Sequence, residues 1–177
     1  MRVTGGRYAG RRISCPAGVI RPAMDRMRES FFAILGHLAD CSFLDLYCGS
    51  GIVGIEASSR GAEPVVLVER DRVKRSAILK NIELVESSIE LFVLPVKHFL
   101  RLCHDVFDVI FVDPPFNMQH KIEVLGEIDK RNLLRSSGCL IMHTPKQDKT
   151  ESTIGNLSLA DRRTYGQSIL LFYRYLK

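Results

Sequence analysis

Short apolar runs alternate with longer segments of mixed polarity along most of this 177-residue chain. The runs have the length and composition of buried strands, and they cover residues 43–46, 64–68, 89–94, 107–112 and 139–143. The segments between them are predicted as helices over residues 52–59, 70–84, 95–103 and 121–135. This alternation predicts an α/β fold, in which helices cover both faces of a doubly wound, mostly parallel sheet.

The two ends of the chain extend this core. Apolar residues from Met24 to Leu38 recur at helical spacing, which predicts another helix over residues 23–38. Residues 159–165 and 168–175 predict an antiparallel hairpin that turns at Gly166-Gln167. The hairpin completes a Rossmann-like sheet of seven strands, one of them reversed.

Residues 3–13 contain three glycines between short runs, and they predict a small hairpin with arginines on its exposed face. We interpret residues 1–20 as an appendage to a core over residues 23–177, and the whole chain as a single domain. A hydrophobic content of 46% is enough for one sizeable core. We expect the protein to be a monomer.

Composition narrows the class of protein. No apolar run reaches membrane-spanning length, and the first residues lack the apolar core of a secretory signal, so we expect a cytoplasmic protein without a membrane partner. The five cysteines include no C-x-x-C pair. They predict neither disulfides nor a zinc site, and we expect no metal.

The net charge of +5 lies at the N-terminal end, where residues 1–30 hold seven arginines against Asp25 and Glu29. A guanidinium group binds phosphate with two parallel hydrogen bonds, so this end is a candidate nucleic-acid surface. The alternative is a solvated basic face without a partner. The candidate contacts are Arg2, Arg7, Arg11, Arg12, Arg21, Arg26 and Arg28.

The stretch from Phe43 to Gly54 predicts a strand, a glycine loop and the start of a helix, an arrangement that suits a cofactor. Its glycines match the dinucleotide pattern G-x-G-x-x-G, but Asp45 would repel a pyrophosphate and hold a cation. We therefore expect the amino acid moiety of S-adenosylmethionine over this loop. The alternative is that Asp45 only caps the turn. The expected contacts are Asp45, Tyr47, Gly49, Ser50 and Gly51.

Glu69 ends the second predicted strand, 18 residues after Gly51. A carboxylate at this place can accept both ribose hydroxyls of an adenosine. We expect Glu69 to bind the ribose and Arg70 to contact the adenine edge. The charged residues that follow, from Asp71 to Arg75, are interpreted as solvent-facing.

Asp113-Pro114-Pro115-Phe116 follows the apolar run 107–112 and forms a second candidate site. The prolines lack N–H donors, which leaves the Asp113 carboxylate and the Pro114 carbonyl as acceptors for an exocyclic amine. Such acceptors can draw the amine lone pair out of conjugation and aim it at an electrophile, while Phe116 stacks on a flipped base. The alternative is a structural turn with a capping aspartate.

The glycine-loop motif, Glu69 and Asp-Pro-Pro-Phe resemble class I S-adenosylmethionine-dependent methyltransferases that modify exocyclic amines. The segments Arg7–Arg12, Arg21–Phe32 and Arg163–Gly166 are similar to the RsmD family of 16S ribosomal RNA guanine-N2 methyltransferases. The resemblance covers nearly the whole chain. It implies that the substrate is a guanine of 16S rRNA, presented in the 30S subunit or in an assembly intermediate.

The chain departs from the family pattern at Pro95, where members typically carry an acidic residue that holds the adenine amine. Adenine would then depend on backbone groups near Val96, or Lys97 and His98 would cover it. Ala23 stands where a threonine is common, which weakens that helix start. His120 and His143 could line the pocket, although isolated histidines are more often structural.

Two other functions remain open on the sequence alone. A DNA adenine or cytosine amino-methyltransferase shares the two motifs, but such enzymes usually carry a separate target-recognition region for which this chain has no room. A non-catalytic ribosome-assembly factor could keep the fold and bind RNA through the basic end. The intact Asp113–Phe116 motif favours the enzyme.

Overall fold

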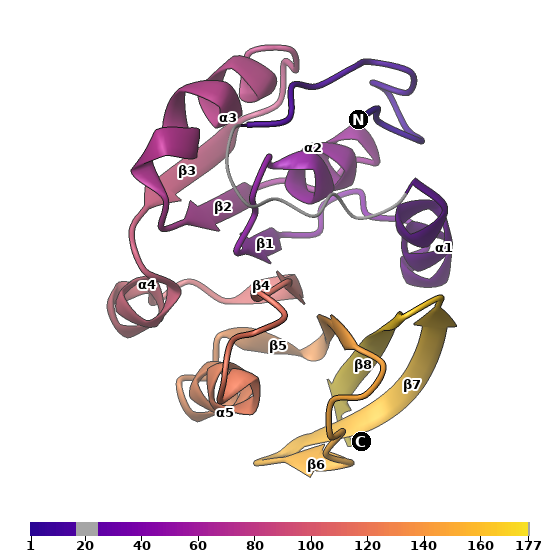
Figure 1. The fold of residues 1–177 in the computed structure, drawn as a ribbon, viewed down its shortest axis with the longest axis vertical. Coiled ribbons are helices and arrows are strands. Elements are labelled where there is room, and N and C mark those ends of the chain that lie inside the picture. The colour runs from indigo at the N-terminus through magenta and orange to yellow at the C-terminus, as the bar shows by residue number, and fades with distance from the viewer. Residues whose placement is uncertain (17–24, 177) are drawn as a thin grey trace.

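The computed structural model describes residues 1–16 and 25–176, which form one eight-stranded sheet with helices on both faces (Figure 1). The strand order is β3-β2-β1-β4-β5-β8-β7-β6. The strands are β1 (Phe43–Leu46), β2 (Val65–Glu69), β3 (Ile89–Val93), β4 (Phe107–Val112), β5 (Leu134–Pro145), β6 (Thr153–Ile154), β7 (Leu157–Tyr165) and β8 (Ser168–Tyr175). β1 to β5 pair in parallel and the last three strands pair antiparallel, which confirms the predicted α/β sheet.

The helices cover both faces of the sheet (Figure 1), and the sheet separates two hydrophobic cores, one on each face. They are α1 (Asp25–Leu35), α2 (Ile52–Ser59), the 3-10 turn η1 (Arg72–Lys74), α3 (Arg75–Ile82), α4 (Val96–Leu102) and α5 (Lys121–Lys130). Helices α1, α2 and α3 contribute to the first core, and α4 and α5 to the second. None of the helices in the described ranges is long and apolar enough to cross a membrane.

Side chains of the parallel strands alternate between the two cores, and this alternation positions the polar residues at the strand ends. In β1, Phe43 lies in the first core and Leu44 in the second, and in β4 Phe111 and Val112 divide in the same way. By this alternation, four polar residues at the carboxyl ends of the strands belong to the first face: Asp45, Glu69, Asp113 and His143.

Several boundaries differ from those predicted. Helix α5 ends at Lys130, not at residue 135, because Asn132 adopts a φ of 54°, the left-handed conformation that ends helices. Strand β5 therefore begins at Leu134, ahead of the predicted residue 139. The predicted helix over residues 70–84 divides into η1 and α3. The two-residue strand β6 adds an eighth strand to the seven predicted.

The N-terminal segment is part of the core and not the predicted appendage. Its predicted hairpin is reduced to an isolated bridge between Arg2 and Arg12, with a few neighbouring backbone hydrogen bonds. Val3, Tyr8 and Ile13 are buried in the first core. The Tyr8 amide donates a hydrogen bond to the Ser59 hydroxyl at 2.8 Å, which attaches the segment to the end of α2. Apolar residues placed between the arginines therefore anchor this segment.

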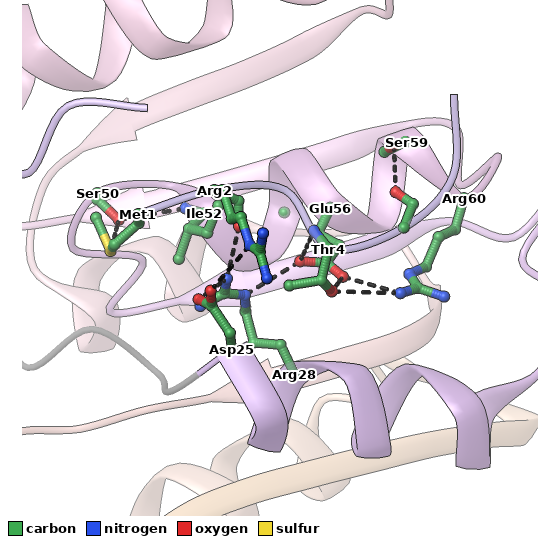
Figure 2. A network of polar contacts seen from close by, with 12 residues as sticks. Met1, Arg2, Thr4, Asp25, Arg28, Ser50, Ile52, Glu56, Ser59 and Arg60 are labelled. Carbon is green, nitrogen blue, oxygen red and sulfur yellow. Dashed lines mark hydrogen bonds and ion pairs between the residues drawn. The ribbon is translucent and has the colours of Figure 1, made fainter. Parts of the chain in front are cut away.

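A buried ion pair joins α1 to α2 beneath the N-terminal segment (Figure 2). Arg28 and Glu56 both have fully buried side chains, and their Nε and Oε2 atoms lie 3.1 Å apart. Arg28 also binds Asp25 at 2.8 Å and the Arg2 carbonyl at 2.7 Å. Breaking such a pair from one side costs about 3–5 kcal/mol. The prediction that Arg28 contacts nucleic acid was therefore wrong, because this side chain has no access to solvent.

Candidate active site

Three carboxylates from three neighbouring strands line one cavity of about 840 Å³. Asp45 lies in β1, Glu69 ends β2 and Asp113 directly follows β4. These strands pair in parallel with Leu46 opposite both Val68 and Val112, so their carboxyl ends meet at one edge of the sheet. The sheet thus brings the two candidate sites of the sequence into a single cavity.

The glycine loop forms one wall of the cavity through a run of left-handed backbone conformations. Tyr47, Gly49 and Gly51 have φ values of 64°, 58° and 78°. A Cβ atom on Gly54 would lie 2.2 Å from the Leu67 side chain, so the third glycine of the pattern allows α2 to pack closely on the sheet. Tyr47 also lines the cavity, and burial raises the pKa of its hydroxyl to about 12.

Asp45 is 1% exposed, and its Oδ2 atom accepts the Gly54 N–H at 3.0 Å. Burial raises the pKa of this carboxyl well above 3.8, the Gly54 hydrogen bond opposes that shift, and the negative charges of Asp113 and Glu69 add to it. The Gly54 hydrogen bond is the turn-capping contact considered above, yet it does not offset the cost of burying the negative charge of Asp45. A cation in the cavity would do so.

Glu69 is held at the mouth of the glycine loop by three donors. Its carboxylate accepts the Gly49 N–H at 3.1 Å, the Asp71 N–H at 2.9 Å and the Lys74 ammonium at 3.3 Å. Lys74 is only 9% exposed, so the interpretation of this lysine as solvent-facing was wrong. The turn η1 directs the Lys74 side chain back toward β2. The run of charged residues from Asp71 to Arg75 does not predict this direction.

Asp113 is oriented by a residue of the adjacent strand β5. The Asp113 Oδ1 atom lies 2.9 Å from His143 Nδ1, and the Phe116 ring packs edge-on against the His143 ring at 5.3 Å between centroids. Lys121 donates to the Phe116 carbonyl at 2.7 Å and also binds Asp148. His143 was noted in the sequence but given no role, and Lys121 was missed, because both depend on contacts between separate segments.

Most of the predicted cofactor and catalytic residues share the cavity. Gly51 is the N-cap of α2 and Val96 is buried in the second core, and neither is among the lining residues. The predicted residues that line the cavity are Asp45, Tyr47, Gly49, Ser50, Glu69, Arg70, Asp113, Pro114, Pro115 and Phe116.

The predicted basic surface is only partly available to a partner. Arg7 pairs with Glu86, Arg11 donates to the Leu84 carbonyl, and both guanidinium groups lie over the Tyr8 ring. Arg2 pairs with Asp25 at 3.4 Å. Arg21 lies outside the described residues. Arg12 and Arg26 are exposed, and within the described ranges their side chains have no ion pair or hydrogen bond.

The fold and the cavity agree with the comparison to known proteins. A family model described as Conserved hypothetical protein 95 matches residues 1–174. The chain belongs to this family. It is the RsmD methyltransferase family that the motifs resemble, so the predicted family is confirmed.

Individual relatives extend over almost the full chain. YlbH of Bacillus subtilis is 32% identical over 189 residues, which cover 98% of each chain. The Escherichia coli K12 protein named Ribosomal RNA small subunit methyltransferase D is 28% identical, with 98% of this chain and 89% of that relative covered. The solved structure of YhhF from Escherichia coli has a TM-score of 0.89 at 28% identity, covering 99% of this chain and 97% of that chain. The RsmD-family chain therefore has the class I methyltransferase fold.

Because the pKa of Asp45 is raised in the folded protein, we expect the charge of this carboxylate to lower the free energy of unfolding at neutral pH. A carboxyl whose pKa rises on folding contributes most stability below its unfolded pKa, near 3.8, and loses it as the pH rises through the folded value. Asp45→Asn removes the charge but keeps an oxygen for the Gly54 N–H. We expect this variant to raise the free energy of unfolding at pH 7 by about 0.5–2 kcal/mol, a gain that should shrink as the pH falls.

Urea denaturation at several pH values would measure this gain. Asp71→Asn is the matched control, because Asp71 is a more exposed carboxylate at the same cavity, with 39% of its side chain accessible. A destabilised Asp45→Asn protein at neutral pH would contradict the electrostatic interpretation of this residue.

Proposed function

We propose that this RsmD-family protein transfers a methyl group from S-adenosylmethionine to the exocyclic N2 amine of a guanine in 16S rRNA. One observation carries the proposal: the Asp113–Phe116 motif lines the same cavity as Asp45 and Glu69. An acceptor for an amine and a site for a cationic nucleoside cofactor therefore lie within reach of each other. The printed names of relatives, such as Ribosomal RNA small subunit methyltransferase D, support ribosomal RNA as the substrate class.

The donor groups of the cavity fit S-adenosylmethionine. Glu69 would accept the ribose hydroxyls at the end of β2, and Asp45 lies beneath the loop where the ammonium group of the amino acid moiety would rest. Tyr47, Gly49 and Ser50 would border that moiety, and Arg70 would face the adenine. The strand-end carboxylates Asp45, Glu69 and Asp113 put negative charge on the sheet side of the cavity, where the cationic groups of the cofactor would lie, while Arg70, Arg72 and Lys74 line its other side. When bound, this cofactor supplies an electrophilic methyl group on a sulfonium.

The residues of the Asp113–Phe116 motif would prepare the amine for transfer. The lone pair of the guanine amine is delocalised into the ring. It becomes nucleophilic when hydrogen bonds to the two amine hydrogens turn the lone pair out of that conjugation. The Asp113 carboxylate and the Pro114 carbonyl would each accept one N–H, and Phe116 would stack on the base. Together they fix the direction of the lone pair, and positioning of this kind supplies a large share of a catalytic rate.

The exposed arginines of the N-terminal segment and α1 support an RNA partner. Arg12 and Arg26 belong to the first 30 residues, which carry the whole charge excess of the chain. A 30S particle or its assembly intermediate presents structured RNA to such a surface. We propose that a single copy of the protein binds it.

Asp113 offers the direct test of this function. Wild-type protein should transfer labelled methyl groups into 30S particles that lack the modification, and nucleoside analysis should identify N2-methylguanosine. Asp113→Ala should lower the transfer rate by roughly a hundredfold or more without loss of cofactor binding, as removal of a positioning group does. Asp113→Asn should retain partial activity, because the amide still offers one acceptor oxygen.

Full activity of a folded Asp113→Ala protein would contradict the proposed role of the carboxylate. Methylated adenine or cytosine in DNA would point instead to a DNA amino-methyltransferase. RNA binding without any methyl transfer by the wild-type protein would point to an assembly factor.

The basic surface gives a second test. Replacing both Arg12 and Arg26 by glutamine should reduce the slope of log affinity against log salt for the RNA by about 1–2, because each phosphate contact contributes about 0.7–0.9 to that slope. Arg101 and Lys130 are exposed on α4 and α5, so Arg101→Gln with Lys130→Gln removes equal charge from the opposite face of the sheet. If the two double variants change the slope equally, the location of the RNA surface is wrong.

A further inference from the structure

Asp113 lacks the local support that usually orients an aspartate at a turn. Such a side chain commonly accepts the backbone N–H two residues further along, which forms an Asx turn. Here the two following residues are Pro114 and Pro115, and proline has no backbone N–H. The motif that creates an amine acceptor therefore removes the local donors for its own carboxylate. The donor that the structure shows comes from another part of the chain.

His143 supplies that donor from strand β5. β4 and β5 pair in parallel with Val112 opposite Met142, so the next residues, Asp113 and His143, continue side by side. Both belong to the face of the first core, and His143 Nδ1 lies 2.9 Å from Asp113 Oδ1. Within the described part of the chain, this is the one hydrogen bond to the Asp113 carboxylate. The second oxygen, Oδ2, stays available.

The surroundings of His143 favour one arrangement of its ring. A carboxylate only accepts hydrogen bonds, so Nδ1 must carry the hydrogen that it donates to Asp113. His143 is 7% exposed, and its Nε2 atom is buried without a hydrogen-bond partner among the described residues. A hydrogen on Nε2 would therefore be a buried, unpaired donor. Of the two forms of the ring with a single hydrogen, the one with that hydrogen on Nδ1 avoids this cost.

The same ring also limits the motion of Phe116. The two rings meet edge-on, with an interplanar angle of 67° and 5.3 Å between their centroids. A substitution of His143 would thus alter the surroundings of both the Asp113 carboxylate and the Phe116 ring.

We propose that His143 is a positioning residue for methyl transfer: it donates from Nδ1 to Asp113 Oδ1 and thereby directs Oδ2 at the amine of the substrate base. This inference rests on the proposed function and adds a residue to its site. His143 acts through Asp113 and does not itself touch the base. Its effect should therefore appear in the rate of transfer and not in the affinity for cofactor or RNA.

Two substitutions separate positioning from simple packing. His143→Leu keeps much of the volume but removes the donor, and His143→Asn places an amide N–H near the position of Nδ1. We expect His143→Leu to lower kcat about tenfold or more, the size of a lost hydrogen bond to a charged group, with KM and cofactor affinity within about twofold of wild type. His143→Asn should recover most of the lost kcat.

The matched control is His104→Gln, because His104 is exposed and lies before the amino end of β4, away from Asp113. It should leave all three constants unchanged. Wild-type kcat in His143→Leu, or an equally low kcat in His143→Asn, would overturn the proposal. So would a loss of cofactor affinity that parallels the loss of kcat.

An NMR measurement that does not depend on methyl transfer tests the contact between His143 and Asp113 independently of the proposed function. Long-range ¹H–¹⁵N spectra of ¹⁵N-histidine-labelled protein should show His143 with its hydrogen on Nδ1, and Asp113→Ala should alter that signal. A ring whose Nδ1 carries no hydrogen in the wild-type protein would overturn the inference. If the expected tautomer is found in a protein that transfers no methyl group, the proposed function fails while the Asp113–His143 contact stands.

Discussion

The carboxyl ends of four parallel strands meet at one edge of the sheet, and the rest of the site depends on this constraint. β1, β2 and β4 end close to one level, β5 continues beyond them in register with β4, and side-chain alternation turns one polar residue of each strand to the same face at that level. Three of these residues are carboxylates that line one cavity. Burial, with a smaller contribution from the charges of Asp113 and Glu69, raises the pKa of Asp45, so a cation in the cavity would stabilise this carboxylate. The fourth, His143, orients one of the carboxylates.

The glycine loop is connected to the N-terminal segment through Asn81. Asn81 is fully buried and donates both to the Ser50 carbonyl, at 3.0 Å, and to the Ser14 carbonyl, at 2.9 Å. The ion pair between Arg28 and Glu56 fixes α2, which begins directly after the loop. Residues that looked like a basic appendage therefore help to set the geometry of the cofactor loop, while Arg12 and Arg26 remain exposed.

Local sequence was sufficient for the parts of the site that depend on strand ends. Asp45, Glu69 and Asp113 each follow from an apolar run and the residues beside it, so their positions could be predicted. Tertiary contacts decide the remainder: Arg28 is buried because α1 packs against Glu56, and Lys74 reverses direction in η1 to reach Glu69. Helical periodicity and charge runs contain no information about such partners.

Two residues show the limit of sequence reasoning most clearly. His143 could be seen as polar within an apolar strand, yet its role depends on the register of β4 against β5. Val96 was chosen for its backbone groups beside Pro95; its side chain lies in the second core, so a contact between that backbone and adenine stays a prediction.

The central claim is that cofactor and amine acceptor share this one cavity. A crystal structure with S-adenosylhomocysteine bound tests it most directly. In that complex the ribose hydroxyls should bind Glu69, the amino acid moiety should lie over Gly49 and Ser50, and the sulfur atom should face Asp113. A complex in which the ligand binds elsewhere, or in which Glu69 makes no contact with the ribose and the sulfur faces away from Asp113, would contradict it.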